Sequence, residues 1–124
     1  MSSEALWRLI NAKEVPPTDF AGFADVRVVA TAHLEAFERP EAGGHRFLLG
    51  RHFDYQTAID LLREDVPQLS SRLPKGTPGA GKLEKVYIIN GGKAEKILGI
   101  KYIALNKTMK DSVLQLLEAE ETAA

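Results

Sequence analysis

The stretch Phe23-Ala24-Asp25-Val26-Arg27-Val28-Val29-Ala30-Thr31-Ala32-His33 carries the pattern that decides the fold. From it, side chains recur at three- and four-residue spacing, which predicts an amphipathic helix that ends at Pro40. The side chains at this spacing are Val29, Ala32, His33, Ala36 and Phe37. Asp25 is the best N-cap candidate, and residues 23–26 predict a short strand that leads into the helix.

Helices and short extended segments alternate on both sides of this stretch. Apolar spacing predicts further helices over residues 6–13, 55–66, 91–98 and 107–117. The capping residues predicted for them are Asp54, Asn90, Asn106 and, as a left-handed terminator, Gly99. Further strands are predicted at 46–49 and 86–89, with a connector at 15–22, an irregular segment at 70–83 and a frayed end at 118–124. Strands this short make a poor sheet, so the chain is predicted to be part of an α/β architecture.

Composition places this chain among ordinary globular proteins. Its 124 residues fit a single domain, 44% of them are hydrophobic, and the net charge is −1. That charge offers no basic field for nucleic acid or for anionic lipid. The absence of cysteine excludes disulfides and thiolate chemistry. No membrane-spanning run or signal peptide is visible, so we expect a soluble, cytoplasmic protein.

The string Gly76-Thr77-Pro78-Gly79-Ala80-Gly81-Lys82-Leu83 matches the G-x-x-x-x-G-K pattern of phosphate-binding loops. Leu83 stands where the magnesium-binding hydroxyl belongs. The preceding residues are polar, and the following ones predict a strand rather than a helix whose dipole would face a phosphate. We therefore interpret the string as a surface loop, and a nucleotide-binding protein is the weakest functional hypothesis.

No complete catalytic constellation is visible in the sequence. A G-x-G-x-x-G dinucleotide fingerprint is absent, and no tyrosine is followed four residues later by lysine. The three histidines, His33, His45 and His52, lack the spacing of a metal-ligand set. The residues by themselves predict no catalytic, cofactor-binding or metal-binding residue in this chain.

A resemblance adds to this reading. The stretch quoted first resembles the V-D-V-R-D-V-A-x-A-H segment of extended short-chain dehydrogenases/reductases, particularly the aldehyde, methylglyoxal and cinnamoyl-CoA reductases. Further segments resemble the family in the same order, at residues 38–42, 46–49, 53–63, 73–76 and 93–102. The family's second acid is replaced by Val28, and its leading valine by Ala24. The resemblance covers nearly the whole chain and corresponds to the carboxyl-terminal, substrate-binding portion of the family.

The resemblance implies a fold and a function. The fold is a helix-rich, incomplete carboxyl-terminal lobe of an extended Rossmann-type reductase, spanning residues 1–124 as a single partial domain. The intact family reduces aldehydes or ketones with NADPH, whereas this chain is expected to bind no cofactor and to be inactive alone. The pocket wall is expected to come chiefly from the connector between Glu14 and Phe23 and from residues near Asp25. The residues expected to line the substrate are Pro17, Phe20, Phe23, Asp25 and Arg27.

Two further expectations concern partners and alternatives. Val29, Phe37, Phe47 and Leu48 are expected to form an exposed apolar face that binds a cofactor-binding Rossmann domain or a second copy of the chain. The small-molecule partner is a carbonyl substrate, with no nucleic acid and no membrane. The alternative function is a non-catalytic module, derived from the same family, that binds a small molecule or a protein.

Overall fold

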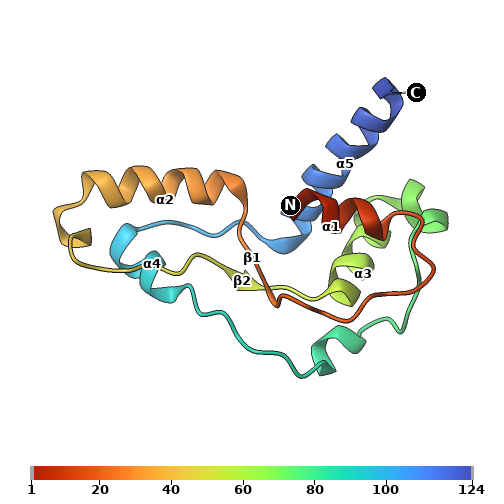
Figure 1. The fold of residues 1–124 in the computed structure, drawn as a ribbon, viewed down its shortest axis with the longest axis horizontal. Coiled ribbons are helices and arrows are strands. Elements are labelled where there is room, and N and C mark those ends of the chain that lie inside the picture. The colour runs from red at the N-terminus through yellow and green to blue at the C-terminus, as the bar shows by residue number, and fades with distance from the viewer. Residues whose placement is uncertain (1, 124) are drawn as a thin grey trace. The chain divides into compact units, whose positions relative to one another are not determined.

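The computed structural model describes residues 2–123 (Figure 1). Its α-helices are α1 (Ser2–Leu9), α2 (Val26–Glu38), α3 (Tyr55–Asp65), α4 (Gly92–Leu98) and α5 (Leu105–Ala123). Its strands are β1 (Gly22–Phe23) and β2 (Arg51–His52), and its 3-10 helices are η1 (Pro40–Ala42), η2 (Pro67–Arg72) and η3 (Ala80–Leu83). The predicted helix-rich α/β character is confirmed.

The chain divides into two compact units. Unit 1 comprises residues 1–19, 54–85 and 104–124, and unit 2 comprises residues 20–53 and 86–103. Both units are therefore assembled from segments far apart in the sequence. Each unit has its own buried core. That the two units together make a single partial domain stays a prediction.

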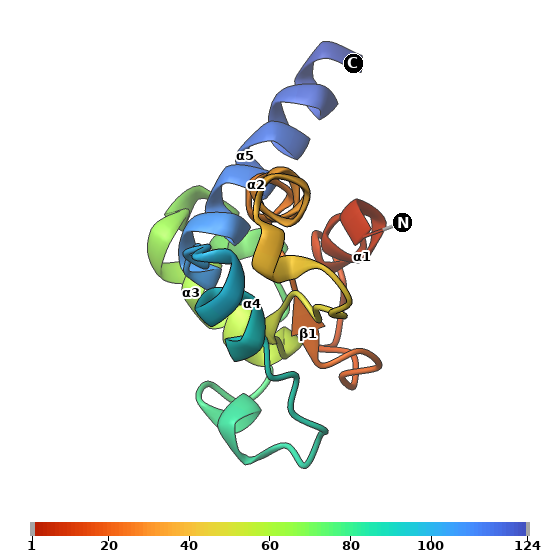
Figure 2. The same cartoon turned by 90° about the vertical axis from the view of Figure 1, so that its left-hand side faces the viewer.

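Unit 1 is a small helical assembly. Helix α5 packs against α3 and α1, and α3 also contacts η2 and η3 (Figure 2). The apolar side chains that hold it together are buried, and they include Leu9, Ile59, Leu62, Leu69, Met109 and Val113. Removing this apolar surface from water is the main stabilising contribution, at about 25 cal/mol per Å².

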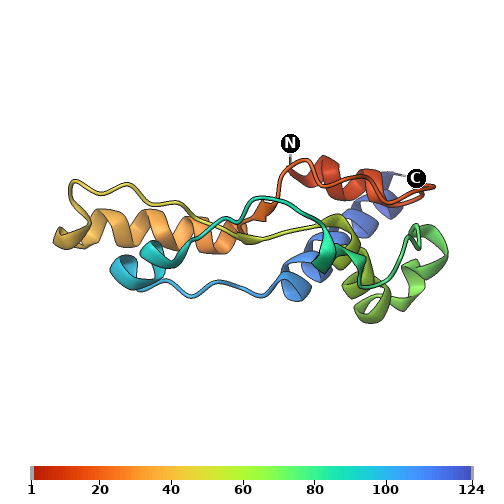
Figure 3. The same cartoon turned by 90° about the horizontal axis from the view of Figure 1, so that it is seen from below.

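Unit 2 combines a minimal antiparallel strand pair with two helices. Gly22 of β1 pairs with His52 of β2, and Phe23 pairs with Arg51. Helices α2 and α4 lie side by side (Figure 3), and both contact η1. The core comprises the buried residues Val28, Ala32, Ala42, Ala94, Leu98 and Ile100. Val28, which replaces an acid of the family motif, therefore contributes to the core of this unit.

The periodic face of α2 is only partly buried. Val28 and Ala32 are its buried residues, whereas Phe37 is 90% exposed and Val26 is 77% exposed. Leu48, which follows in the chain, is also exposed, while Val29 and Phe47 are half-buried and Phe47 packs on the core. Phe37 and Leu48 are therefore exposed as expected, whereas Val29 and Phe47 are less exposed than expected, and a single apolar face made by the four residues stays a prediction.

Two predicted strands are not formed. Residues 46–49 and 86–89 have no strand pairing, and β1 (Gly22–Phe23) shares only Phe23 with the predicted strand at 23–26. A β-branched and aromatic pattern favours extended backbone, but a strand also requires a neighbour that completes its hydrogen bonds. Between residues 2 and 123 the only such pair is β1 with β2.

The helix boundaries are mostly as expected. Asp25 caps α2, Asp54 caps α3, and Gly99 ends α4 with a left-handed φ of 67°. Asn106 lies inside α5 rather than at its cap. Helix α5 continues to Ala123 within the end expected to fray, and residue 124 lies outside the described residues. Short 3-10 helices, η2 and η3, interrupt the segment that was predicted to be irregular. In the described part of the chain, no helix is long and apolar enough to cross a membrane.

Candidate functional site

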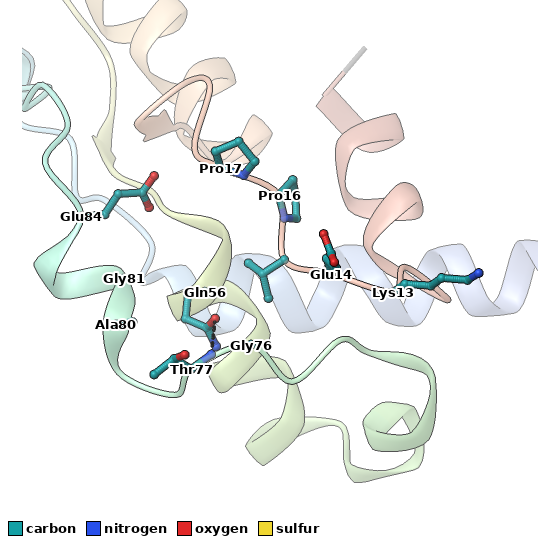
Figure 4. A pocket seen from close by; sticks show the side chains of 11 residues that line it. Lys13, Glu14, Pro16, Pro17, Gln56, Gly76, Thr77, Ala80, Gly81 and Glu84 are labelled. Carbon is teal, nitrogen blue, oxygen red and sulfur yellow. Dashed lines mark hydrogen bonds between the residues drawn. The ribbon is translucent and has the colours of Figure 1, made fainter.

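A cavity of about 550 Å³ opens on unit 1 (Figure 4). One wall is the connector that follows α1, and the other is the glycine-rich loop that precedes and includes η3. The lining residues used below are Glu14, Val15, Pro17, Gln56, Thr77 and Glu84. A volume of this size lies within the range of small-molecule sites.

Gln56 fixes the glycine-rich loop to helix α3. Its side-chain amide donates to the Lys75 carbonyl at 3.0 Å, and its side-chain oxygen accepts from the Thr77 amide at 3.2 Å. The side chain is buried and also donates to Asp60 at 2.9 Å. The same Asp60 carboxylate accepts from the Gly79 amide at 2.9 Å. The first turns of α3 thus hold the backbone of the loop at residues 75, 77 and 79.

Two glycines allow the loop to approach α3 this closely. A side chain on Gly81 would collide with the buried carboxylate of Asp54, which caps α3 by accepting from the Thr57 amide at 2.7 Å. Gly76 has a φ of 56°, and a Cβ there would overlap with the Gln56 side chain and with Val15. The cavity shape therefore depends on the absence of side chains at these two positions.

The connector is tied to the end of the loop by one carboxylate. Glu84 accepts from the Thr18 amide at 2.9 Å and from the Thr18 hydroxyl at 2.8 Å. Two prolines at positions 16 and 17 restrict the backbone of the connector just before this contact. Both walls of the cavity are consequently fixed by side-chain to backbone hydrogen bonds.

Tyr55 lies beside this assembly, at the start of α3. Its hydroxyl donates to Asp19 at 3.1 Å. Burial is the first cause that raises the pKa of Tyr55, and the hydrogen bond to Asp19 adds to it. Because the pKa lies above its usual value near 10, the phenol stays protonated at neutral pH and acts as a hydrogen-bond donor.

The residues expected to contact substrate belong to both units. Pro17 lines the cavity of unit 1 (Figure 4), while Phe20, Phe23, Asp25 and Arg27 belong to unit 2. Phe20 is exposed and makes an edge-to-face contact with Tyr87, with ring centroids 6.1 Å apart. Phe23 is half-buried in β1.

Asp25 and Arg27 form one structural unit. The buried Asp25 carboxylate accepts from the Arg27 amide at 2.9 Å, which caps α2. The guanidinium of Arg27 also donates to both carboxylate oxygens, at 2.9 and 2.7 Å. Because the buried carboxylate both caps the helix and pairs with the guanidinium, it fixes the start of α2.

The known proteins that are similar to this chain in sequence and in structure are reductases. No family model matches the chain. The putative NADPH-dependent methylglyoxal reductase of Candida albicans is 40% identical over 123 residues, covering 94% of this chain and 36% of that protein. A cinnamoyl-CoA reductase of Medicago truncatula is 32% identical over 117 residues, covering 94% of this chain and 35% of that protein. The solved yeast methylglyoxal/isovaleraldehyde reductase complexed with NADPH superposes with a TM-score of 0.81 at 34% identity.

Sequence and structure agree on the relatives of this chain. Over nearly its whole length the chain matches the carboxyl-terminal portion of extended short-chain dehydrogenases/reductases, as the sequence resemblance predicted. It spans 36% of the Candida albicans relative and 40% of the solved yeast reductase, so the activity of those whole proteins does not follow for this chain.

The sequence pattern of a phosphate-binding loop at residues 76–83 does not provide a site for NADPH, the cofactor named for those relatives. In a phosphate-binding loop, several backbone amides are left to donate to the anion. Here the Thr77 amide donates to Gln56, and the Gly79 amide donates to the Asp60 carboxylate. The loop then enters the 3-10 helix η3 instead of an α-helix. This segment is therefore a loop held by side chains of α3, as the sequence predicted, rather than a phosphate-binding loop.

Sequence reasoning missed the residues that build the cavity. Gln56, Asp60 and Glu84 act through contacts with backbone 19 to 66 positions away in the sequence. The only local signal was the density of glycine and proline in the loop, which indicated turns without indicating what they pack against. Among residues 2–123, no cluster of three or more acidic or histidine side chains could hold a metal ion.

Proposed function

We propose that this chain is the substrate-side portion of an NADPH-dependent reductase that acts on small aldehydes or ketones. The observation that carries the proposal is the superposition of 96% of the chain on the solved yeast reductase, with a TM-score of 0.81. That protein is a methylglyoxal/isovaleraldehyde reductase. The cavity of unit 1, held by Gln56 and Glu84, supports a role in binding the carbonyl compound.

The chain would contribute binding rather than hydride chemistry. The glycine fingerprint and the tyrosine–lysine pair are not among its 124 residues. In this proposal Pro17, Phe20 and Phe23 contact substrate, while the capped pair of Asp25 and Arg27 fixes the backbone that follows Phe23. The chain alone would therefore reduce no aldehyde, and NADPH would be held by another part of the enzyme.

The partner of unit 2 would be that NADPH-binding part. Phe37 and Val26 are 90% and 77% exposed on the same side of α2, and the charged residues of the helix lie on other sides. Covering a phenylalanine side chain contributes about 1.5–3 kcal/mol. The substitution Phe37→Ser would then lower the melting temperature of an assembled reductase and leave that of the isolated chain nearly unchanged.

A chimera tests this function. The region of the yeast reductase that matches this chain is replaced by residues 1–124, and NADPH oxidation is followed with methylglyoxal and isovaleraldehyde. The proposal expects aldehyde-dependent oxidation by the chimera and none by a yeast reductase from which the region is deleted. A folded chimera that binds NADPH but oxidises none with either aldehyde contradicts the proposal.

One observation favours a second function. The cavity is formed by unit 1 alone, so it can bind a small molecule without any residue of a catalytic centre. A non-catalytic binding module of the same family would show ligand-dependent thermal stabilisation without turnover. For such a module the stabilisation should be the same with and without NADPH. Turnover in the chimera would instead favour the reductase.

A further inference from the structure

The cavity of unit 1 contains two polar groups that have no partner in the described chain. Within residues 2–123, neither the Glu14 carboxylate nor the Thr77 hydroxyl makes a hydrogen bond or an ion pair. Glu84 is the second carboxylate of the lining, and it already accepts from Thr18. The cavity therefore offers a hydroxyl and an uncommitted carboxylate to a ligand.

Positive charge does not balance these carboxylates inside the cavity. Lys13 is the only basic residue of the lining, and its ammonium group points away from Gln56 and Thr77 (Figure 4). The two carboxylates, Glu14 and Glu84, outnumber the single ammonium group, so the lining carries a net negative charge. Both carboxylates are exposed, so their repulsion of an anion is screened by water and by salt.

Much of the remaining lining of the cavity consists of small apolar side chains. Val15, Pro16, Pro17 and Ala80 contribute it, at the sides of the polar groups. Such a surface suits a small aliphatic group, because apolar contact requires no directional partner. A ligand that fits would combine a short aliphatic part with a hydrogen-bond donor for the Glu14 carboxylate.

We propose that this cavity is the subsite for the part of the substrate remote from the reacting carbonyl, and that it selects by charge. It accepts uncharged or cationic groups that donate hydrogen bonds, such as amides, hydroxyls and ammonium groups. It rejects carboxylates and phosphates, and with them substrates whose remote part carries such groups. The assignment to a substrate rests on the proposed function, whereas the charge selectivity is a property of the chain itself.

Three probes of matched shape test the selectivity: isovaleramide, isovalerate and isopentylamine. Each is titrated into the full chain, and amide proton–nitrogen correlation spectra follow the signals of Gly76, Thr77 and Gly79. Isovaleramide and isopentylamine are expected to shift these signals saturably. Isovalerate is expected to bind at least about tenfold more weakly, a difference that shrinks as salt is added. Equal affinity for isovalerate and isovaleramide, or no shift with any probe, overturns the proposal.

A charge variant tests the residue that carries the selectivity. Glu14→Gln removes the negative charge with almost no change in shape, and is expected to bring isovalerate within about threefold of isovaleramide while weakening isopentylamine. Glu118→Gln, on the exposed surface of α5, is the control that changes net charge equally outside this cavity. An identical gain in isovalerate affinity for both variants would mean that net charge alone is measured, which contradicts the proposal.

The test separates this inference from the proposed function. Probe binding is measured on the isolated chain, without NADPH and without turnover. Charge-selective binding together with an inactive chimera would retain the charge selectivity of the cavity but remove its assignment to a reductase substrate. An active chimera together with unselective binding would do the reverse.

Discussion

Replacing Gln56 by leucine tests how the cavity wall is held. Leucine keeps the volume and the packing of this buried side chain but removes its hydrogen bonds to Lys75, Thr77 and Asp60. A hydrogen bond contributes about 0.5–1.5 kcal/mol net, and the exposed loop can pair with water instead. The loop should therefore open more easily by about 1–3 kcal/mol, with a much smaller change in the stability of unit 1.

Hydrogen exchange measures this opening residue by residue. Each kcal/mol corresponds to about a fivefold change in the open population, so the Thr77 amide should exchange at least about fivefold faster in Gln56→Leu. The buried amides of α3 should change little. Gln115→Leu, an exposed glutamine of α5, is the matched control. Unchanged exchange at Thr77 would refute the role given to Gln56.

The remaining predictions concern a cap, an ion pair and a surface residue. Asp54→Ala should lower the free energy of unfolding in urea by about 1–2 kcal/mol, because it removes the buried cap of α3. A decrease below about 0.3 kcal/mol would argue against the capping role. Hydrogen bonding to Arg72 lowers the pKa of Glu120 below 4.5, so the ion pair stabilises above that pH and is lost as pH falls through the folded-state pKa. Carboxyl titration by NMR should show this, and Arg72→Met should restore the ordinary pKa. Phe37→Ser should reduce dye binding to exposed apolar surface without lowering the unfolding midpoint, since the ring is 90% exposed; an unaltered dye signal would contradict this.

Local chemistry made part of the fold predictable. Asp25 and Asp54 are acids placed before apolar periodic runs, and their side chains accept from backbone amides as helix caps do. Gly99 adopts the left-handed conformation that ends α4. These contacts join residues close in sequence, so the sequence alone is sufficient to propose them.

Non-local pairing explains the errors. Residues 46–49 and 86–89 have strand-like composition, but in residues 2–123 no neighbouring strand pairs with them. The Asn106 cap was wrong: α5 begins at Leu105, two residues before the predicted start at 107, so Asn106 already lies inside the helix. The loop contacts of Gln56 depend on how α3 meets a segment about 20 residues away, which spacing and propensity do not encode.

The family assignment came from several ordered segments rather than from any single motif. The resemblance implied a pocket wall along the connector from Glu14 to Phe23, but it gave no sign of the opposite wall, where Thr77 stands outside the segments that carried the resemblance. The structure places Glu14 and Thr77 in the lining of one cavity. Resemblance thus predicted the relatives of the chain, and the structure was needed to bring the two walls of the cavity together.

The proposed division of labour, in which this chain binds substrate and another part of the enzyme carries out hydride transfer, is tested by NADPH oxidation. Absorbance is followed with the purified chain alone and isovaleraldehyde or methylglyoxal in excess. We expect no oxidation above the protein-free rate, and oxidation only when the chain is joined to the NADPH-binding part in the chimera. Steady oxidation proportional to the concentration of the isolated chain would contradict the proposed division.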